Sequence, residues 1–365
     1  MNVKNVFKPK VAALAAAMGL AFAGTAAHAA PTASLFGAIG IVGAYDSPYT
    51  QGGQNSWYVS NDASRLGVKG NLGTYDGTTY IYNYTSNIDP VNESGGLSTY
   101  IGYLGAKGAW GTFKFGRPLN PFYNAIGATF NPFWWFFTDN TGTRGTDNSI
   151  IYTTPTMSGF QASIGIEHIG KGSSSGDKST ADTTLAATYA TGPFSFAAAF
   201  ASYSKYADGS TAYSSAADYN VYGTGASNTY SGEVLKSKAA VSGTYSQGPF
   251  SVSLGFFSYK PYNSGTQNEK DITSVNILGS YNFMPKWTVM ADFSTTSQSS
   301  SSYGIAHKGS FTTLSLAYTP VDPVGLFVEY QYADKKAVQS QLDGIYYGNA
   351  TKAFGELAIG GYYSF

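Results

Sequence analysis

The feature that most constrains this chain is a period-two alternation of apolar and polar side chains, which recurs along most of its length. The segments 248–259, 285–294 and 323–332 show it most clearly. In the first of them the apolar positions are Phe250, Val252, Leu254 and Phe256, and serines and a glycine lie between them. Successive side chains of a β-strand point to opposite faces, so each segment predicts a strand with one apolar and one polar face.

The connections between these segments alternate between short and long. The short ones contain Gly or Pro and lie near Leu72–Tyr75, Gly108–Trp110, Pro155–Gly159, Gly192-Pro193, Gly248-Pro249, Met284-Pro285 and Pro320–Pro323. The long polar ones lie at 46–56, 87–97, 118–147, 170–182, 205–235, 261–270, 297–309 and 334–352. Seven turns and eight loops predict sixteen antiparallel strands, with both chain ends on the turn side. Short turns on one side and long loops on the other are typical of outer-membrane barrels.

A soluble β-sandwich also produces alternating strands, but it does not need this many long strands or this asymmetry of connections. Tyr, Phe and Thr favour strands, and 44 glycines among 365 residues disfavour long helices. No linker divides the chain after residue 29. The expected fold is therefore all-β: one transmembrane antiparallel β-barrel of sixteen strands over residues 30–365.

The N-terminus carries the pattern of a secretory signal peptide. Lys4, Lys8 and Lys10 precede a short apolar stretch, which ends at the cleavage signature Ala27-His28-Ala29. A retained membrane anchor is the alternative, but the stretch is short and rich in alanine. We expect residues 1–29 to be removed, and Ala30 to begin the mature protein.

Composition excludes several functions. The chain has no cysteine, so a disulfide framework and a thiolate metal site are excluded. Without the three lysines of the signal, 18 basic residues face 21 acidic ones, a net charge of −3. Because no basic stripe appears, nucleic-acid binding is not indicated. We expect no cofactor and no enzyme activity, because no catalytic motif is present and His168 and His307 are predicted on the surface near loops.

The last strand is the sharpest local signal. The residues of its apolar face are Leu357, Ile359, Gly361, Tyr363 and Phe365, and the chain stops at the last of these. A strand that runs to the final residue can pair with the first strand, Ser34–Tyr45. That pairing would leave no open edge, which a lipid environment does not tolerate.

Several stretches resemble the Gram-negative general porins. They are Ser64–Gly70, Tyr103–Lys107, Gly111–Arg117, Asn148–Pro155 leading into Ser158–Phe160, and the terminal Gly361–Phe365. The resemblance covers most of the barrel. It implies a homotrimer in the outer membrane, in contact with lipid and lipopolysaccharide, and passive diffusion of small hydrophilic solutes and ions. It also implies that the assembly machinery reads the strand ending at Phe365.

The resemblance further implies that the third long loop folds into the barrel and narrows it. Alternation turns Arg65 and Lys69 toward the lumen, and Tyr100 stands where the family carries a second arginine. The candidate residues of the constriction are Arg65, Lys69, Tyr100, Lys114, Asp139, Arg144, Asp147, Lys236 and Lys238. They either form a tuned filter or are ordinary hydrated lumen residues. Weak ion preference is predicted from the near balance of charges on the polar strand faces, which carry Arg65, Lys69, Lys114, Lys236 and Lys238 against Glu167, Asp292, Glu329 and Glu356.

Residues 130–137 contain six aromatic side chains in eight positions. That much apolar area is costly to expose to water, at about 25 cal/mol per Å². The rings therefore either anchor the loop to the barrel wall, which we favour, or line the channel and guide sugars or aromatic solutes. The second reading makes the protein a substrate-preferring channel. A barrel enzyme or adhesin is a third and weaker alternative.

The second long loop contains one glutamate, Glu93. In the resembling family this loop reaches a neighbouring subunit near the root of the third loop. Alternation places Arg117 with Phe113 and Phe115 rather than on the lumen face, so Arg117 is expected to be a structural anchor or the latch partner of Glu93. Arg144 is the alternative partner.

Overall fold

The computed structural model describes residues 31–48, 53–92, 96–136, 145–169, 181–203, 235–261, 270–299, 308–339 and 352–365. The strands are β1 (Thr32–Asp46), β2 (Ser56–Asn61), β3 (Arg65–Tyr75), β4 (Thr78–Asn87), β5 (Ser98–Gly108), β6 (Gly111–Arg117), β7 (Ser149–Thr153), β8 (Phe160–Glu167), β9 (Asp182–Thr191), β10 (Phe194–Ser202), β11 (Leu235–Gln247), β12 (Phe250–Pro261), β13 (Ile272–Met284), β14 (Trp287–Gln298), β15 (Gly309–Val321), β16 (Val324–Ala333) and β17 (Phe354–Ser364). Two short helices accompany them, the π-helix η2 (Tyr123–Gly127) and α2 (Lys335–Gln339).

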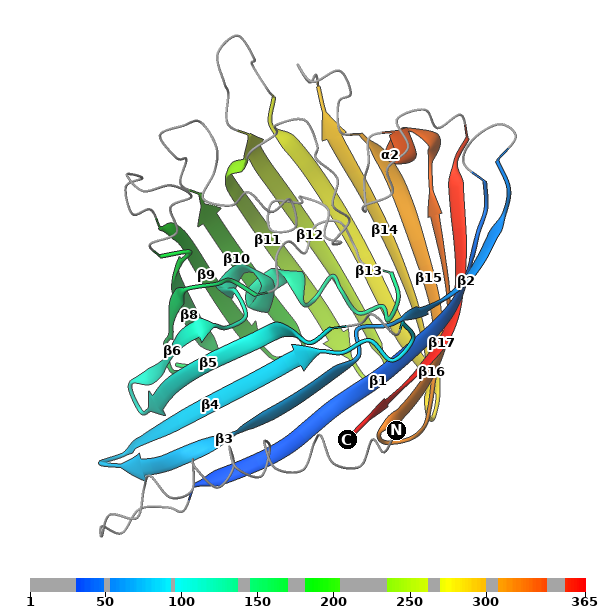
Figure 1. The fold of residues 1–365 in the computed structure, drawn as a ribbon. Helices are drawn as coiled ribbons and strands as arrows, with labels where there is room; N and C mark the ends of the chain where they lie inside the picture. Colours follow the sequence, from blue (N-terminus) through cyan, green and yellow to red (C-terminus); the bar gives the residue numbers. More distant parts are fainter. Residues whose placement is uncertain are drawn as a thin grey trace, which may run out of the picture.

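Apart from β2 and β3, consecutive strands pair antiparallel, and β17 pairs with β1 to close the sheet (Figure 1). Strands β2 and β3 both pair with β1, so they act as one interrupted strand. The 17 named strands therefore form a closed barrel of sixteen. This confirms the expected strand number and the pairing of the first strand with the last.

The interruption between β2 and β3 falls at residues 62–64. Ala63 adopts a positive φ of 49°, which bends the strand away from regular pairing. The buried hydroxyl of Ser64 accepts a hydrogen bond from the Gly40 N–H at 2.9 Å and donates one to the Gly40 carbonyl at 3.2 Å. Ser64 thereby satisfies the Gly40 N–H at the interruption, and the Gly40 carbonyl also accepts a hydrogen bond from the Asp62 N–H at 2.9 Å.

All seven predicted turns and all eight predicted loops fall between strands, with one difference at the first turn. β3 continues through Tyr75, so the turn predicted near Leu72–Tyr75 lies within this strand, and Asp76-Gly77 forms the turn instead. Both turn residues have positive φ, 45° and 72°. A two-residue hairpin turn of this kind requires positive φ at both central positions, which Asp-Gly supplies at low cost.

The two faces of the wall have opposite character. In β14, Val289 and Phe293 are exposed on the outside, whereas Asp292 and Ser294 are buried on the inside. This polarity is the reverse of a soluble protein, and it suits a wall between lipid and a polar interior. Among the described residues, no helix is both long and apolar enough to cross a membrane.

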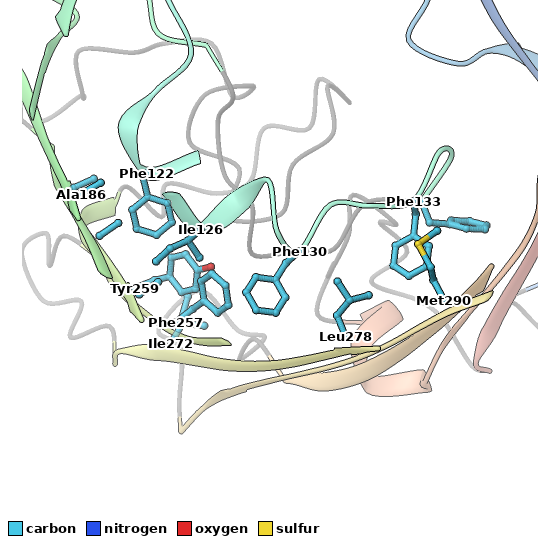
Figure 2. Close-up of a cluster of buried hydrophobic side chains, with 14 of the residues drawn as sticks. Phe122, Ile126, Phe130, Phe133, Ala186, Phe257, Tyr259, Ile272, Leu278 and Met290 are labelled. Carbon is cyan, nitrogen blue, oxygen red and sulfur yellow. The ribbon is translucent and has the colours of Figure 1, made fainter. Parts of the chain in front are cut away.

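The apolar core lies inside the barrel, between the segment 118–136 and the inner face of the wall. η2 contacts β9, β10 and β11. Figure 2 shows Phe122, Ile126 and Phe130 of this segment directed at the wall residues Phe257 and Tyr259. The described half of the third loop therefore packs on one side of the barrel interior.

Candidate functional site

The root of the third loop is pinned by Arg117 and Asp147, which form an ion pair. Arg117 Nε also donates a hydrogen bond to the carbonyl of Tyr100, with 3.1 Å between the two atoms. Gly116, whose φ is +124°, breaks the regular alternation just before Arg117. This explains how Arg117 leaves the outward face of Phe113 and Phe115 that strict alternation assigned to it. It serves as an anchor within its own chain.

A carboxylate of the wall holds the loop at residues 134–136. Glu329 Oε1 accepts a hydrogen bond from the Trp134 N–H at 2.9 Å. Its Oε2 accepts from the Trp135 N–H at 2.9 Å and from the Phe136 N–H at 3.2 Å. The hydroxyl of Ser315 donates to Oε1 at 3.1 Å. Four donors therefore surround one fully buried carboxylate, which compensates its loss of hydration.

A second carboxylate repeats this arrangement on the neighbouring strand. Glu356 Oε1 accepts hydrogen bonds from the indole Nε1 of Trp135 at 2.6 Å and from the hydroxyl of Tyr58 at 2.7 Å. The ring of the preceding loop residue, Trp134, stacks on Tyr362, which lies further along the same strand, with 4.0 Å between the ring centroids. Glu329 and Glu356 are inward charges that the alternation identified, but it gave no sign that they bind the loop.

The aromatic stretch of the loop is largely buried. Phe130, Phe133 and Phe136 are 0%, 5% and 4% exposed. Phe130 meets Phe257 edge to face, with 5.7 Å between the ring centroids. These three rings support the anchoring interpretation. Trp134 is less buried, and Phe137 lies outside the described residues.

Lys238 points inward, as its strand predicts, but the loop covers it. Its Nζ lies 4.2 Å from the ring centroid of Phe122, and the residue is 4% exposed. Nearby, the Asn120 side-chain amide donates to Glu167 Oε2 at 3.3 Å. Lys238 and Glu167 therefore belong to a buried polar cluster beneath the loop, not to an open channel surface.

The prediction for His168 was wrong. The residue is 3% exposed rather than on the surface, and its Nδ1 lies 2.8 Å from Asp182 Oδ2. It follows the last residue of β8 with a positive φ of 56°, which directs the ring to the first residue of β9. A local backbone conformation of this kind leaves no signal in the alternation pattern. His307 lies outside the described residues.

Arg65 and Tyr100 meet on the inner face. Arg65 Cζ lies 4.2 Å from the ring centroid of Tyr100. In the pairing of β4 with β5, Thr85 opposes Ile101 and Ser86 opposes Thr99, so Tyr100 is the extra residue of a β-bulge. A bulge redirects the side chain that it carries. The outward Leu104 would otherwise place Tyr100 on the lipid side.

The other candidate residues lie on the barrel wall, at the loop root, or outside the described residues. Lys69 is exposed on the inner face, with its Nζ 4.7 Å from the ring centroid of Phe36. Lys114 is half-buried, 5.0 Å from the ring centroid of Tyr103, and Lys236 is exposed. Asp147 pairs with Arg117 at the loop root. Glu93, Asp139 and Arg144 lie outside the described residues.

The turn formed by residues 89–92, directly before Glu93, belongs to the part of the chain that the structure describes. The side chain of Asn92 and the backbone N–H groups of Val91 and Asn92 donate hydrogen bonds to the Asp89 carboxylate, and these bonds lower its pKa. The acidic turn therefore stays charged near neutral pH and fixes the chain that leads into the second loop.

A cavity of about 530 Å³ lies between the wall and the loop. The wall contributes Phe36, Arg65, Tyr100 and Tyr362, and the loop contributes Tyr123 and Trp134. Strand alternation and the family resemblance predict Arg65 and Tyr100 here, and lining of the channel is one of the two alternatives for the loop aromatics. Phe36 and Tyr362 were not predicted, although both lie on the inward faces of predicted strands.

A profile of the family described as Gram-negative porin matches residues 12–301, most of the chain. The chain belongs to this family. It is accordingly an outer-membrane channel built as a sixteen-stranded barrel, and not an enzyme. The comparison with curated proteins found no significant match.

The porin also resembles solved structures over 92% of its length. The anion-selective porin of Comamonas acidovorans is 17% identical, with a TM-score of 0.71 and all of its chain covered. The trimer form of OmpT from Vibrio cholerae is 16% identical, with a TM-score of 0.64 and all of its chain covered. The channel DcaP of Acinetobacter baumannii is 15% identical, with a TM-score of 0.64 and 97% covered. These likenesses support the fold.

Proposed function

We propose that this porin is a water-filled channel for passive diffusion of small hydrophilic solutes and ions, narrowed by its third loop. The observation that carries the proposal is the position of segment 118–136. It packs on the inner face of β9–β14, β16 and β17, and it leaves a cavity toward β1, β3 and β5. Solutes would pass on that open side.

The open side is more basic than the composition suggested. Glu167, Asp292 and Glu329 are at most 1% exposed, and Glu356 is 8% exposed. On the open side, Arg65 is half-exposed and Lys69 is exposed. The inward carboxylates are thus largely covered while these cations remain in contact with water. We therefore propose a modest preference for anions instead of the near balance expected from counting charges. The structurally similar Comamonas porin is anion-selective.

Recordings from the purified protein in a planar bilayer test this function. We expect stepwise conductance. In a salt gradient, we expect the reversal potential to shift toward the equilibrium potential of the anion. Absence of conductance steps would reject the channel. A reversal potential on the cation side would reject the charge argument but not the channel.

We further propose that the porin is a homotrimer, as the trimer form of the similar OmpT supports. In this arrangement Glu93 of one subunit latches onto Arg117 or Arg144 near the loop root of another. Residues 1–29 act as a removed signal peptide, and lipopolysaccharide surrounds the outer rim. Native mass measurement of the detergent-extracted protein tests the trimer, and N-terminal sequencing tests cleavage before Ala30.

A second function, a channel with a preferred solute, is favoured by one specific observation. The open cavity is lined by aromatic rings from both the wall and the loop.

A further inference from the structure

The cavity between Arg65 and Trp134 has the composition of a binding site. Its lining contains the guanidinium of Arg65 and several aromatic rings, which include those of Phe36, Tyr100, Tyr123, Trp134 and Tyr362. Aromatic surfaces bind planar apolar groups by stacking, and a guanidinium binds carboxylates through paired hydrogen bonds.

The aromatic surface is held in place. Trp134 stacks on Tyr362 at 4.0 Å, with 25° between the ring planes. Its backbone N–H is bound to Glu329 at 2.9 Å. Both contacts fix the indole against the wall without a solute, so little side-chain freedom would be lost on binding.

The guanidinium is oriented but not neutralised. Arg65 stacks on Tyr100, and its Nε donates to the carbonyl of Ala63 at 3.1 Å. No carboxylate of the described residues forms an ion pair with it. A planar guanidinium held at one edge presents its remaining N–H groups as a fork that matches a carboxylate.

Two inward carboxylates of the wall, Glu329 and Glu356, are bound to the loop. Among the described residues that line the cavity, Asp62 is the one with a carboxylate, and this residue already takes part in another interaction. Arg65, which forms no ion pair with a described residue, is therefore the group of the cavity that can bind an anion, and Lys69 lies on the same inner face.

We propose that this cavity is a solute-binding subsite for small aromatic carboxylates, with the carboxylate on Arg65 and the ring against the aromatic surface of Trp134 and Tyr362. The inference rests on the proposed channel function and specifies its solute class. Neutral sugars could stack on the same rings, but they would leave Arg65 without a partner. Simple anions would use Arg65 but not the rings.

Blocking of the bilayer current by benzoate tests the subsite. Benzoate should reduce the conductance with saturation, and acetate and benzyl alcohol should each be about ten-fold weaker because each lacks one of the two contacts. Arg65→Gln should raise the half-blocking concentration of benzoate by about ten-fold, the loss expected for a charge-assisted hydrogen bond. Arg65→Lys, which keeps the charge but not the fork, should lie between the two.

Matched variants separate the subsite from general charge effects. Trp134→Leu should weaken the block by benzoate, and Trp134→Phe should retain most of it. Lys236→Gln removes another inward cation away from the cavity, and it should leave the block unchanged. Current without benzoate confirms that each variant has assembled.

A conducting channel that benzoate does not block would overturn the subsite and leave the diffusion channel standing. So would equal block by acetate, or equal block in the Arg65→Gln variant. Stronger block by neutral maltose would assign the cavity to neutral solutes and likewise overturn the proposal. Absence of current in the unmodified protein would instead overturn the channel function itself.

Discussion

Glu329 and Trp134 join the barrel wall to the third loop, since Glu329 Oε1 accepts a hydrogen bond from the Trp134 N–H at 2.9 Å. The same carboxylate binds the next two backbone N–H groups. A buried anion and a turn of loop backbone therefore satisfy each other. This one side chain thus holds three consecutive backbone N–H groups of the loop.

Glu329→Gln should loosen the loop. An amide offers one acceptor oxygen and places an NH₂ against backbone donors, so charge-assisted bonds worth about 1.5–3 kcal/mol are weakened. We expect a lower melting temperature and more noise in the open-channel current. Asp271→Asn, which removes an exposed carboxylate 3.9 Å from Lys260, is the control that should change neither. A quiet channel with unchanged melting would show that Glu329 does not hold the loop.

The ion pair of Arg117 and Asp147 should stabilise the fold within one chain. Their side chains are 28% and 29% exposed, so we expect a coupling free energy of about 1 kcal/mol. The measurement is a double-mutant cycle of Arg117→Gln and Asp147→Asn, read as melting on semi-native gels. Simple additivity of the two costs would contradict the pairing.

The proposed latch gives a different pattern in the same assay. If Glu93 binds Arg117 of a neighbouring subunit, Glu93→Gln and Arg117→Gln should both lower the melting temperature of the trimer, and their costs should not add. A solvated Glu93 is worth only about 0–1 kcal/mol. Unchanged melting for Glu93→Gln would remove the latch and leave the anchor role of Arg117 intact.

Replacement of Asp292 by an apolar residue should stabilise the protein. Its carboxylate is 1% exposed, and neither oxygen has a hydrogen-bond partner among the described residues. It lies on the inner face between Leu278 and Thr313. A buried carboxylate without a partner costs at least about 1 kcal/mol. We therefore expect Asp292→Leu to raise the melting temperature, whereas a clear decrease would show that the carboxylate has a stabilising role.

Removal of Phe365 should block assembly rather than conduction. Its N–H donates to the Gly37 carbonyl at 3.0 Å, and its carbonyl accepts from the Gly37 N–H at 2.9 Å. These bonds form the last pair of the seam between β17 and β1. We expect deletion of Phe365 or Phe365→Asp to abolish the heat-modifiable barrel in the outer membrane, and Phe365→Tyr to retain it. Normal membrane levels of the deleted form would refute this.

The sequence alone determined the barrel. Alternation in segments such as 285–294 fixes which side chains face lipid and which face the interior, because a strand has a period of two. Gly and Pro in the short turns, together with an apolar strand that ends at Phe365, fix the number of strands and the closing pair. These signals are local in the chain, so they can be read without coordinates.

Only the tertiary structure decided which inward charges remain in contact with water. Glu329 and Lys69 look alike in the strand pattern, yet one is buried under the loop and the other is exposed. The bulge at Tyr100 and the positive φ of His168 also escaped the alternation, because each breaks the period at one residue. The physical reason is that the third loop contacts residues of strands that are far from it in the sequence, such as Glu329, which is 195 residues from Trp134. These contacts form only when the barrel has closed, so the local sequence pattern cannot show them.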